Sequence, residues 1–150
     1  MAIIPFGEYL PDLPALGNPG ATVAKNVIPH LAGYKPLSSL VTFSGALTAR
    51  CQGAFSAIDT AGVTNVYAGD ATSLYRLTDV TWTDASQSGA YTVSSDQAWN
   101  FVRWNNDVLA ANVTDPVQKI TMGGTTFGDL FTSTLKPKAR HMAVVRDFLV

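Results

Sequence analysis

The sequence predicts an all-β protein in which an incomplete set of propeller-like antiparallel blades follows an extended, proline-rich arm. Three observations predict it. Prolines cluster in residues 1–40, short runs of β-branched and aromatic residues begin near residue 41, and these runs recur at a spacing of roughly 42 to 45 residues. We therefore expect two regions: an assembly arm over residues 1–40, and a β-repeat region over residues 41–150 that forms part of a larger domain.

The arm is predicted to be extended because proline fixes its own φ angle and pushes the preceding residue towards extended conformations. Its apolar content argues against disorder, which requires low hydrophobicity. The arm should therefore lie against a surface, either that of its own domain or that of a neighbouring subunit. We favour the neighbour, since the chain carries little charge. The side chains that we expect at this interface are Phe6, Tyr9, Leu10, Leu13, Val27, Ile28 and Tyr34.

Beyond the arm, the apolar runs have the length of strands and are separated by Gly, Asp and Asn, which favour turns. No window of a dozen residues keeps a helical period. Strands are expected at residues 41–43, 54–58, 66–68, 73–77, 101–104 and 108–111.

The repeat sets these strands in register. The first copy runs from residue 57 to 86 and the second from residue 101 to 131, while a third begins at residue 142 as an apolar strand with no turn after it. Trp82 and Phe127 occupy the same place, as aromatic plugs between layers. The predicted repeat core is Tyr67, Leu74, Trp82, Phe101, Leu109 and Phe127. An ordinary β-sandwich with regular turns is the alternative.

Two copies and a fraction cannot close a propeller, which has typically four to eight blades. An exposed apolar strand at an edge also invites association. We therefore expect more polypeptide to complete the sheets, either further residues of the same protein or another chain.

Composition argues against nucleic-acid binding, an intrachain disulfide and a membrane span. Charged residues make up 14% of the chain and cancel to a net charge of -1, and no basic stripe suggests nucleic-acid binding. Cys51 is the single cysteine, so no intrachain disulfide is expected, and its small neighbours suggest a buried position. No apolar stretch approaches the roughly 20 residues that cross a bilayer, so no membrane span is predicted.

We predict neither catalysis nor a cofactor or metal. His30 and His141 lie in the arm and in a basic turn, no Gly-x-Ser-x-Gly elbow is present, and the aspartates are scattered where turns are expected. One alternative is carbohydrate recognition by Trp82, Trp99 and Trp104, although packing inside the repeat is the favoured role of these rings. A glycan-cleaving enzyme is disfavoured, because the segment between Asp79 and Asp84 lacks the glycine that precedes the aromatic residue in a sialidase-type box.

The residues carry a family resemblance. The arm motifs at residues 5–14, 18–29 and 33–36 resemble the opening of tail-nozzle or tubular virion proteins of bacteriophages, and the motif at residues 66–75 resembles their repeated element. The resemblance implies a structural protein of the virion tail, made in the host cytoplasm. Its partners would be copies of itself in a ring, a hexamer, together with other tail or head-to-tail connector proteins, and phage DNA would pass transiently through the channel. A tail-fibre or appendage anchor is the alternative.

Overall fold

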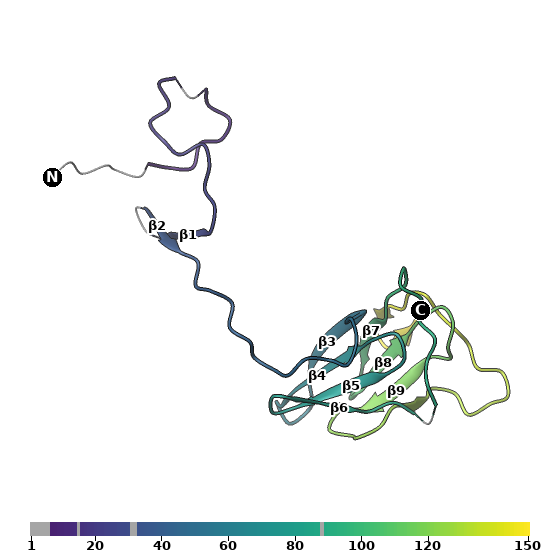
Figure 1. The fold of residues 1–150 in the computed structure, drawn as a ribbon. Coiled ribbons are helices and arrows are strands. Elements are labelled where there is room, and N and C mark those ends of the chain that lie inside the picture. Colours follow the sequence, from purple (N-terminus) through teal and green to yellow (C-terminus); the bar gives the residue numbers. More distant parts are fainter. Residues whose placement is uncertain (1–6, 15, 31–32, 88) are drawn as a thin grey trace. The chain divides into compact units, whose positions relative to one another are not determined.

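The computed structural model describes residues 7–14, 16–30, 33–87 and 89–150 (Figure 1). Phe6, one of the expected interface residues, lies outside them. The contacts divide the chain into two compact units, the described parts of Met1–Val41 and Thr42–Val150. Each unit is described by itself.

Strands are the only regular secondary structure of the described residues, and the named strands pair only in antiparallel fashion. The predicted all-β, antiparallel class is therefore confirmed. Both four-stranded sheets of the described residues are open, since in neither does the last strand pair with the first. Within the described part of the chain, no helix has the length and apolarity needed to cross a membrane.

The first unit contains a hairpin of β1 (Val27–His30) and β2 (Gly33–Pro36). The sequence pattern predicts an extended arm here and no hairpin. The amide of Leu37 donates to the carbonyl of Asn26 (2.9 Å), and bonded pairs alternate along an antiparallel ladder. Pro29 and Pro36 therefore fall in pairs that exchange no hydrogen bonds, so the missing N–H groups do not interrupt the ribbon.

The second unit contains two four-stranded sheets in which each strand pairs with the next along the chain (Figure 1). The first comprises β3 (Gly53–Ile58), β4 (Thr64–Gly69), β5 (Leu74–Thr78) and β6 (Thr81–Asp84). The second comprises β7 (Asn100–Trp104), β8 (Asp107–Ala111), β9 (Gln118–Thr121) and β10 (Gly128–Asp129). A hairpin of β11 (Val144–Val145) and β12 (Phe148–Leu149) follows.

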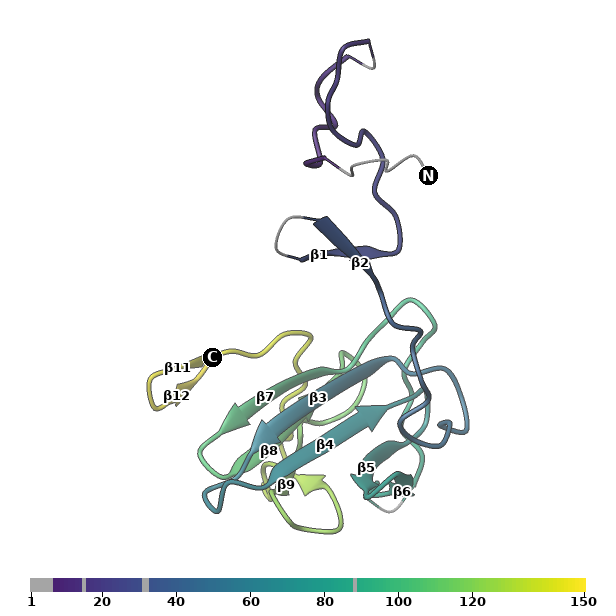
Figure 2. The same cartoon turned by 90° about the vertical axis from the view of Figure 1, so that its left-hand side faces the viewer.

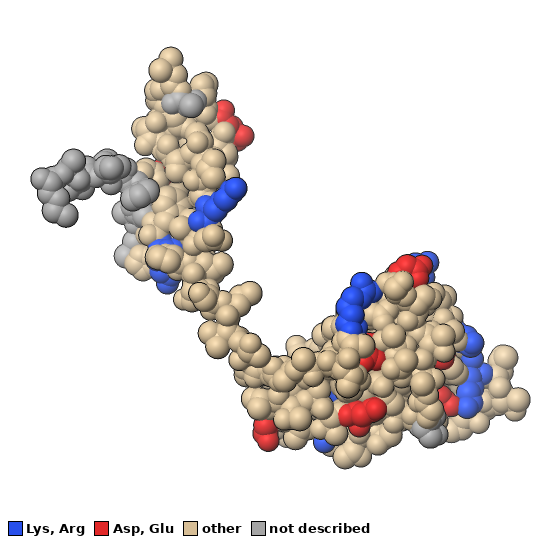
Figure 3. Space-filling model, viewed as in Figure 1, with Lys and Arg blue, Asp and Glu red and all other residues tan. Residues whose placement is uncertain are grey.

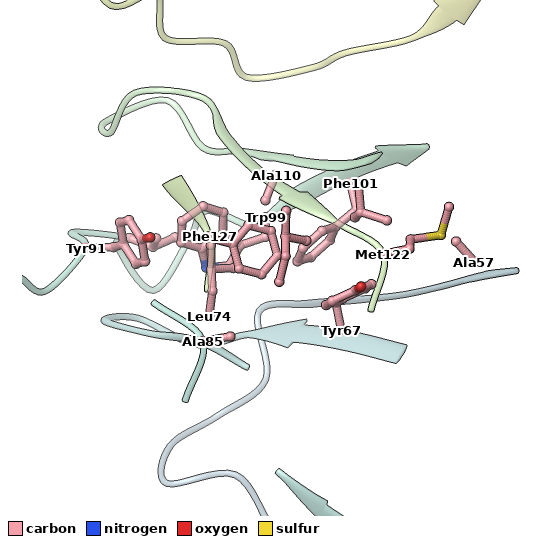
Figure 4. Packing of buried hydrophobic residues seen from close by; sticks show 13 residues of the cluster. Ala57, Tyr67, Leu74, Ala85, Tyr91, Trp99, Phe101, Ala110, Met122 and Phe127 are labelled. Atoms are coloured by element: carbon pink, nitrogen blue, oxygen red, sulfur yellow. The ribbon is translucent and has the colours of Figure 1, made fainter. Parts of the chain in front are cut away.

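The two four-stranded sheets pack as layers, with β3 beside β7 (Figure 2). The core between them is aromatic (Figure 4). Tyr67 of β4 meets Phe127 edge-on at 5.7 Å between ring centroids, and Phe55 of β3 stacks on Phe101 of β7 at 6.2 Å. Aromatic pairs in these geometries add to the free energy gained by burying their area.

A second apolar cluster lies on the other side of the second sheet. It is formed by Leu109, Ala111, Val117 and Met142, with Leu149 packed against it. The β11–β12 hairpin contributes to this cluster, and β11 lies beside β7. The unit is thus built of three successive layers: the first sheet, the second sheet and the hairpin.

Three local expectations are wrong. Residues 41–43 form no strand; Val41 and Phe43 are 86% and 75% exposed where one unit gives way to the next, so no partner strand is at hand. Residues 142–150 form a hairpin and not a single strand, because a turn centred on Arg146, with φ of 55°, divides them. Cys51 is exposed, because the neighbouring Gln52 takes the buried position and donates to the carbonyls of Ser94 and Gln97.

Candidate assembly surfaces

Asp70 and Asn112 mark equivalent places in the two sheets. Each follows the second strand of its sheet, is almost fully buried, and accepts hydrogen bonds from the amides two and three residues ahead. Short side chains of this type close turns in this way. The two residues lie 42 positions apart, which matches the spacing expected from sequence.

The strand registers extend this equivalence. Counting back from the two turns, Tyr67 corresponds to Leu109, and their cross-strand partners Phe55 and Val102 correspond as well. At the far side, the amide of Ala85 donates to the Leu74 carbonyl (2.8 Å), just as that of Leu130 donates to the Val117 carbonyl (2.9 Å). The two sheets are therefore two copies of one unit.

Each sheet has a forward face and a back face, which we define by the side chains they carry. The forward face of the first sheet carries Phe55, Ala57, Tyr67 and Leu74, and the back face of the second carries Phe101, Val108, Ile120 and Phe127. These two faces form the joint between the sheets. Val108, Ile120 and Phe127 are no more than 2% exposed.

The joint recurs one layer further on. The forward face of the second sheet carries Val102, Leu109 and Val117, and it is covered by Met142 and Leu149. When the β11–β12 turn is aligned with the β7–β8 turn, Met142 corresponds to Phe101 and Leu149 corresponds to Val108. The hairpin thus sits on the second sheet by its back face, as the second sheet sits on the first.

Two faces of this stack have no other sheet of the second unit against them in the described residues. The back face of the first sheet carries Val66, Leu77 and Trp82, which the registers equate with Val108, Ile120 and Phe127 and which are only half-buried. Ile58, on the same face, is 53% exposed. The forward face of the hairpin carries Val145 and Val150, which are 56% and 68% exposed.

The segment before β3 reaches one end of the back face of the first sheet. The indole N–H of Trp82 donates to the Ser44 hydroxyl (3.1 Å), and the Gly45 amide donates to the Val80 carbonyl (2.9 Å). Near the other end, where Ala68 and Tyr75 of the same face are buried, Thr48 donates to Asp70. This segment leaves Ile58 and Val80 more than half exposed.

The arm residues expected at an interface lie on the surface of the first unit. Tyr9 and Leu13 are 52% and 48% exposed, and Leu10 and Tyr34 are half-buried. Hydrogen bonds from Leu10 to Ala21 and from Ala21 to Glu8 tie the chain around Tyr9 into a loop. Val27 and Tyr34 line one shallow apolar hollow of this unit, with Ala21, Val23, Ala24, Lys25 and Pro36. Ile28 is 36% exposed.

The residues expected in the repeat core divide between the joint and the open face. Tyr67, Leu74, Phe101 and Phe127 lie in the cluster between the sheets, and Leu109 lies in the cluster beyond the second sheet. Trp82 lies on the open back face and is half-buried. It occupies the position that Phe127 holds in the second sheet, but no sheet of the second unit covers it.

Hydrogen bonds and burial shift the pKa values of three residues in the second unit. Burial raises the pKa of Asp70, but hydrogen bonds from Thr72, Tyr75, Ser73 and Thr48 outweigh it, so the pKa lies below its usual value. Burial raises the pKa of Tyr91 to about 12. A hydrogen bond from Lys136 lowers the pKa of Asp129, helped by a second from Gln118.

Charge is thinly spread over the face of the molecule shown in Figure 3, where Lys and Arg form small separate groups. The long ion pair between Lys119 and Asp107 (3.7 Å) is partly exposed, and such pairs contribute little to stability.

The two histidines lie in different units of the described structure. His30 lies in β1 and is exposed, and His141 lines a hollow whose other described residues are Asp96, Gln97, Ala98, Trp99, Asn100, Val113 and Arg140. This set offers no hydroxyl or thiol as a nucleophile. In the described ranges, no three His, Cys, Asp or Glu side chains group as metal ligands would.

Trp99 and Trp104 are poorly placed to stack on sugars. Trp99 is 4% exposed and its indole N–H donates to the Asp70 carbonyl (2.8 Å). Trp104 is half-buried, packs against the Leu109 cluster and donates to the Asp147 carbonyl (3.1 Å).

Sequence reasoning placed Asp70 at a turn, but it missed that Asp70 and Asn112 are buried at equivalent places, and it missed the role of Trp99. The recurrence of a small residue and then Asp or Asn directly after each second strand, at Gly69-Asp70 and Ala111-Asn112, is a signal that could have found the two turns. No comparable sequence signal marks Trp99, whose partners come from β3 and β4.

A scan against protein-family models found no matching family, and a search of the curated proteins found no match.

Proposed function

We propose that this chain is a structural component of a bacteriophage tail, of the nozzle or tube type, that acts by associating into a ring around the channel through which DNA leaves. The two sheets and the hairpin would be successive propeller-like blades, and the described part of residues 1–40 the assembly arm. The alternative function is an anchor for a tail fibre or appendage that uses the same surfaces.

The observation that carries the proposal is the repeated joint. The same residue positions form the contact between the first and second sheets and between the second sheet and the hairpin. A β-sandwich has two layers, whereas a unit that repeats the same contact a second time belongs to an array. Open apolar faces remain at both ends of that array.

The arm supports an assembly role in a second way. Exposed apolar side chains gather on a unit that has its own backbone hydrogen bonds, at Tyr9, Leu13, Val27 and Ile28. Apolar surface of this kind is typical of contacts with other proteins. Together with the low charge of the chain and the family resemblance of the arm motifs, it favours a subunit of a larger particle.

The test is electron microscopy with analytical ultracentrifugation of the purified chain over a range of concentrations. We expect closed rings of uniform subunit number with a central opening. The double variant Tyr9→Asp with Leu13→Asp should lose the rings. Thr22→Asp, an exposed polar site in the same unit, should keep them. A monomer at every concentration would contradict the proposal.

A separate test concerns the tail. In particles of a phage that encodes this chain, gold-labelled antibody against the purified protein should bind at the tail. Labelling confined to the head, or none on intact and opened particles, would contradict a tail role.

A further inference from the structure

The open back face of the first sheet has an observed counterpart within the same chain. Its residues Val66, Leu77 and Trp82 stand where Val108, Ile120 and Phe127 stand in the second sheet, and those three are buried under the forward face of the preceding sheet. The kind of surface that fits the open face is therefore known: the forward face of another layer of this repeat.

A forward face is also open at the other end of the stack. In the β11–β12 hairpin, Ala143 and Val150 exchange backbone hydrogen bonds of 2.7 and 2.9 Å. In the same turn alignment, this pair corresponds to Val102 and Leu109 of the second sheet. Those two residues correspond in turn to Phe55 and Tyr67 of the first sheet. Val145 and Val150 are exposed on this face, whereas Tyr67 and Leu109 are fully buried in theirs.

We infer that the forward face of the β11–β12 hairpin in one copy of the chain binds the back face of the first sheet in a second copy. The two surfaces differ, so the contact is head-to-tail. Contacts of this kind generate rings when the rotation closes and filaments when it does not. The inference rests on the self-association in the proposed function and adds which surfaces meet; it does not involve the arm.

The observed joint predicts which residues meet in this contact. Tyr67 packs on Phe127 across the joint, so Val150 of one copy should pack on Trp82 of the next. Phe55 stacks on Phe101, so Ala143 of one copy should lie near Ala54 of the next. Ala54 and Ala143 are both exposed in the described structure, and a cysteine at either position would be accommodated without repacking the core.

The first test is site-specific disulfide formation in the full chain. With Cys51 changed to serine, Ala54→Cys and Ala143→Cys proteins are mixed in equal amounts with oxidised glutathione, and the products are separated under non-reducing conditions. We expect a cross-linked dimer in the mixture and much less in either variant alone. The matched control pairs Ala54→Cys with Val113→Cys, an exposed loop position outside the strands of both faces, and should give little product.

The second test is association measured by ultracentrifugation. Ile58→Lys on the back face, or Val145→Lys on the hairpin, should weaken self-association about tenfold or more. A mixture of the two should still form dimers, because each variant keeps the one face that the other lacks. Val113→Lys is the charge-matched control.

The outcomes separate this inference from the proposed function. If rings form normally in Ile58→Lys and Val145→Lys, and no cross-link forms between positions 54 and 143, the inferred contact is overturned but the proposed ring is supported. Cross-linked dimers without any rings support the inference and count against the ring. Equal cross-linking with Val113→Cys also overturns it, because the contact would then lack the predicted register.

Discussion

The indole ring of Trp99 lies directly over Gly69. A Cβ atom placed on Gly69 would come within 2.4 Å of the Trp99 Cδ1 atom and 2.6 Å of its Nε1 atom. Real Cβ atoms do not approach other atoms so closely, so the absence of a side chain at the end of β4 is what lets the tryptophan cross from the second sheet onto the first. The ring also packs edge-on against Tyr91 at 5.1 Å.

Gly69→Ala should therefore destabilise the fold by about 2 kcal/mol or more, because the rigid indole and the strand backbone must both shift. The matched control is Gly128→Ala in β10, where an added Cβ would meet nothing within 4 Å. Urea unfolding monitored by tryptophan fluorescence measures both. Equal unfolding midpoints for the two variants would show that Trp99 moves aside freely.

Phe127 and Trp82 hold the same position in the two sheets, but only Phe127 has a layer packed over it. Phe127→Ala should cost about 3–5 kcal/mol of folding free energy, the usual loss for a buried aromatic side chain. Trp82→Ala should cost only about 1–2 kcal/mol in the isolated subunit. Unfolding at low protein concentration tests this difference, and similar losses would mean that Trp82 already has a full set of neighbours within one copy.

The fold class and most strands could be predicted from sequence, because alternating β-branched and aromatic residues at strand length need no tertiary information. The errors fall where tertiary contacts decide. Val41 and Phe43 have a strand-like composition but no partner strand. Gln52 takes the buried place that composition assigns to Cys51, because backbone carbonyls from distant residues accept its amide hydrogens.

Asp70 should be more important for stability than any other turn aspartate in the repeat. Its carboxylate accepts hydrogen bonds from the amides of Thr72 and Ser73 and from the hydroxyl of Tyr75, at 2.8 to 2.9 Å. Asp70→Ala should cost about 2–4 kcal/mol, because these buried donors lose their acceptor. Asp70→Asn should cost less, since Asn112 closes the equivalent turn. Asp96→Ala, at an exposed site, is the control in urea unfolding.

Asp70 should also make the fold sensitive to acid. Its folded-state pKa lies below the ordinary value of 3.8, so the ionised form stabilises the fold above that pH, and this contribution is lost as the pH falls through the folded-state pKa. Asp59 and Asp129 have lowered pKa values too, and they contribute to the same acid limb. Stability measured from pH 7 down to pH 2 should fall less steeply in Asp70→Asn. Identical slopes would mean that Asp70 does not titrate differently in the two states.

The candidate surfaces were less accessible to sequence reasoning than the fold. The repeat spacing aligns Trp82 with Phe127, as the strand registers do, but residue type alone could not show that one is covered and the other is open. That distinction depends on which face of each strand meets a neighbouring layer, and the face follows from register and turn geometry. The hairpin at residues 144–149 shows the same limit, because its turn uses Arg146 at positive φ, a residue type that does not signal a turn.

Tyr91 lies in the cluster between the two sheets, and its ionisation tests the stability of this joint at high pH. Burial raises its pKa to about 12, its hydroxyl donates to the Gln118 side chain (3.0 Å), and it accepts from the Gln87 amide (3.1 Å). The folded state therefore holds this proton to higher pH than the unfolded state, whose tyrosine ionises near 10. The contribution of Tyr91 to stability should be complete below pH 10 and should be lost as the pH rises towards about 12. Unfolding midpoints at pH 8 and pH 11 measure this loss. Tyr91→Phe should begin less stable and lose less over that interval, whereas an equal loss in both proteins would show that other groups govern the alkaline limb.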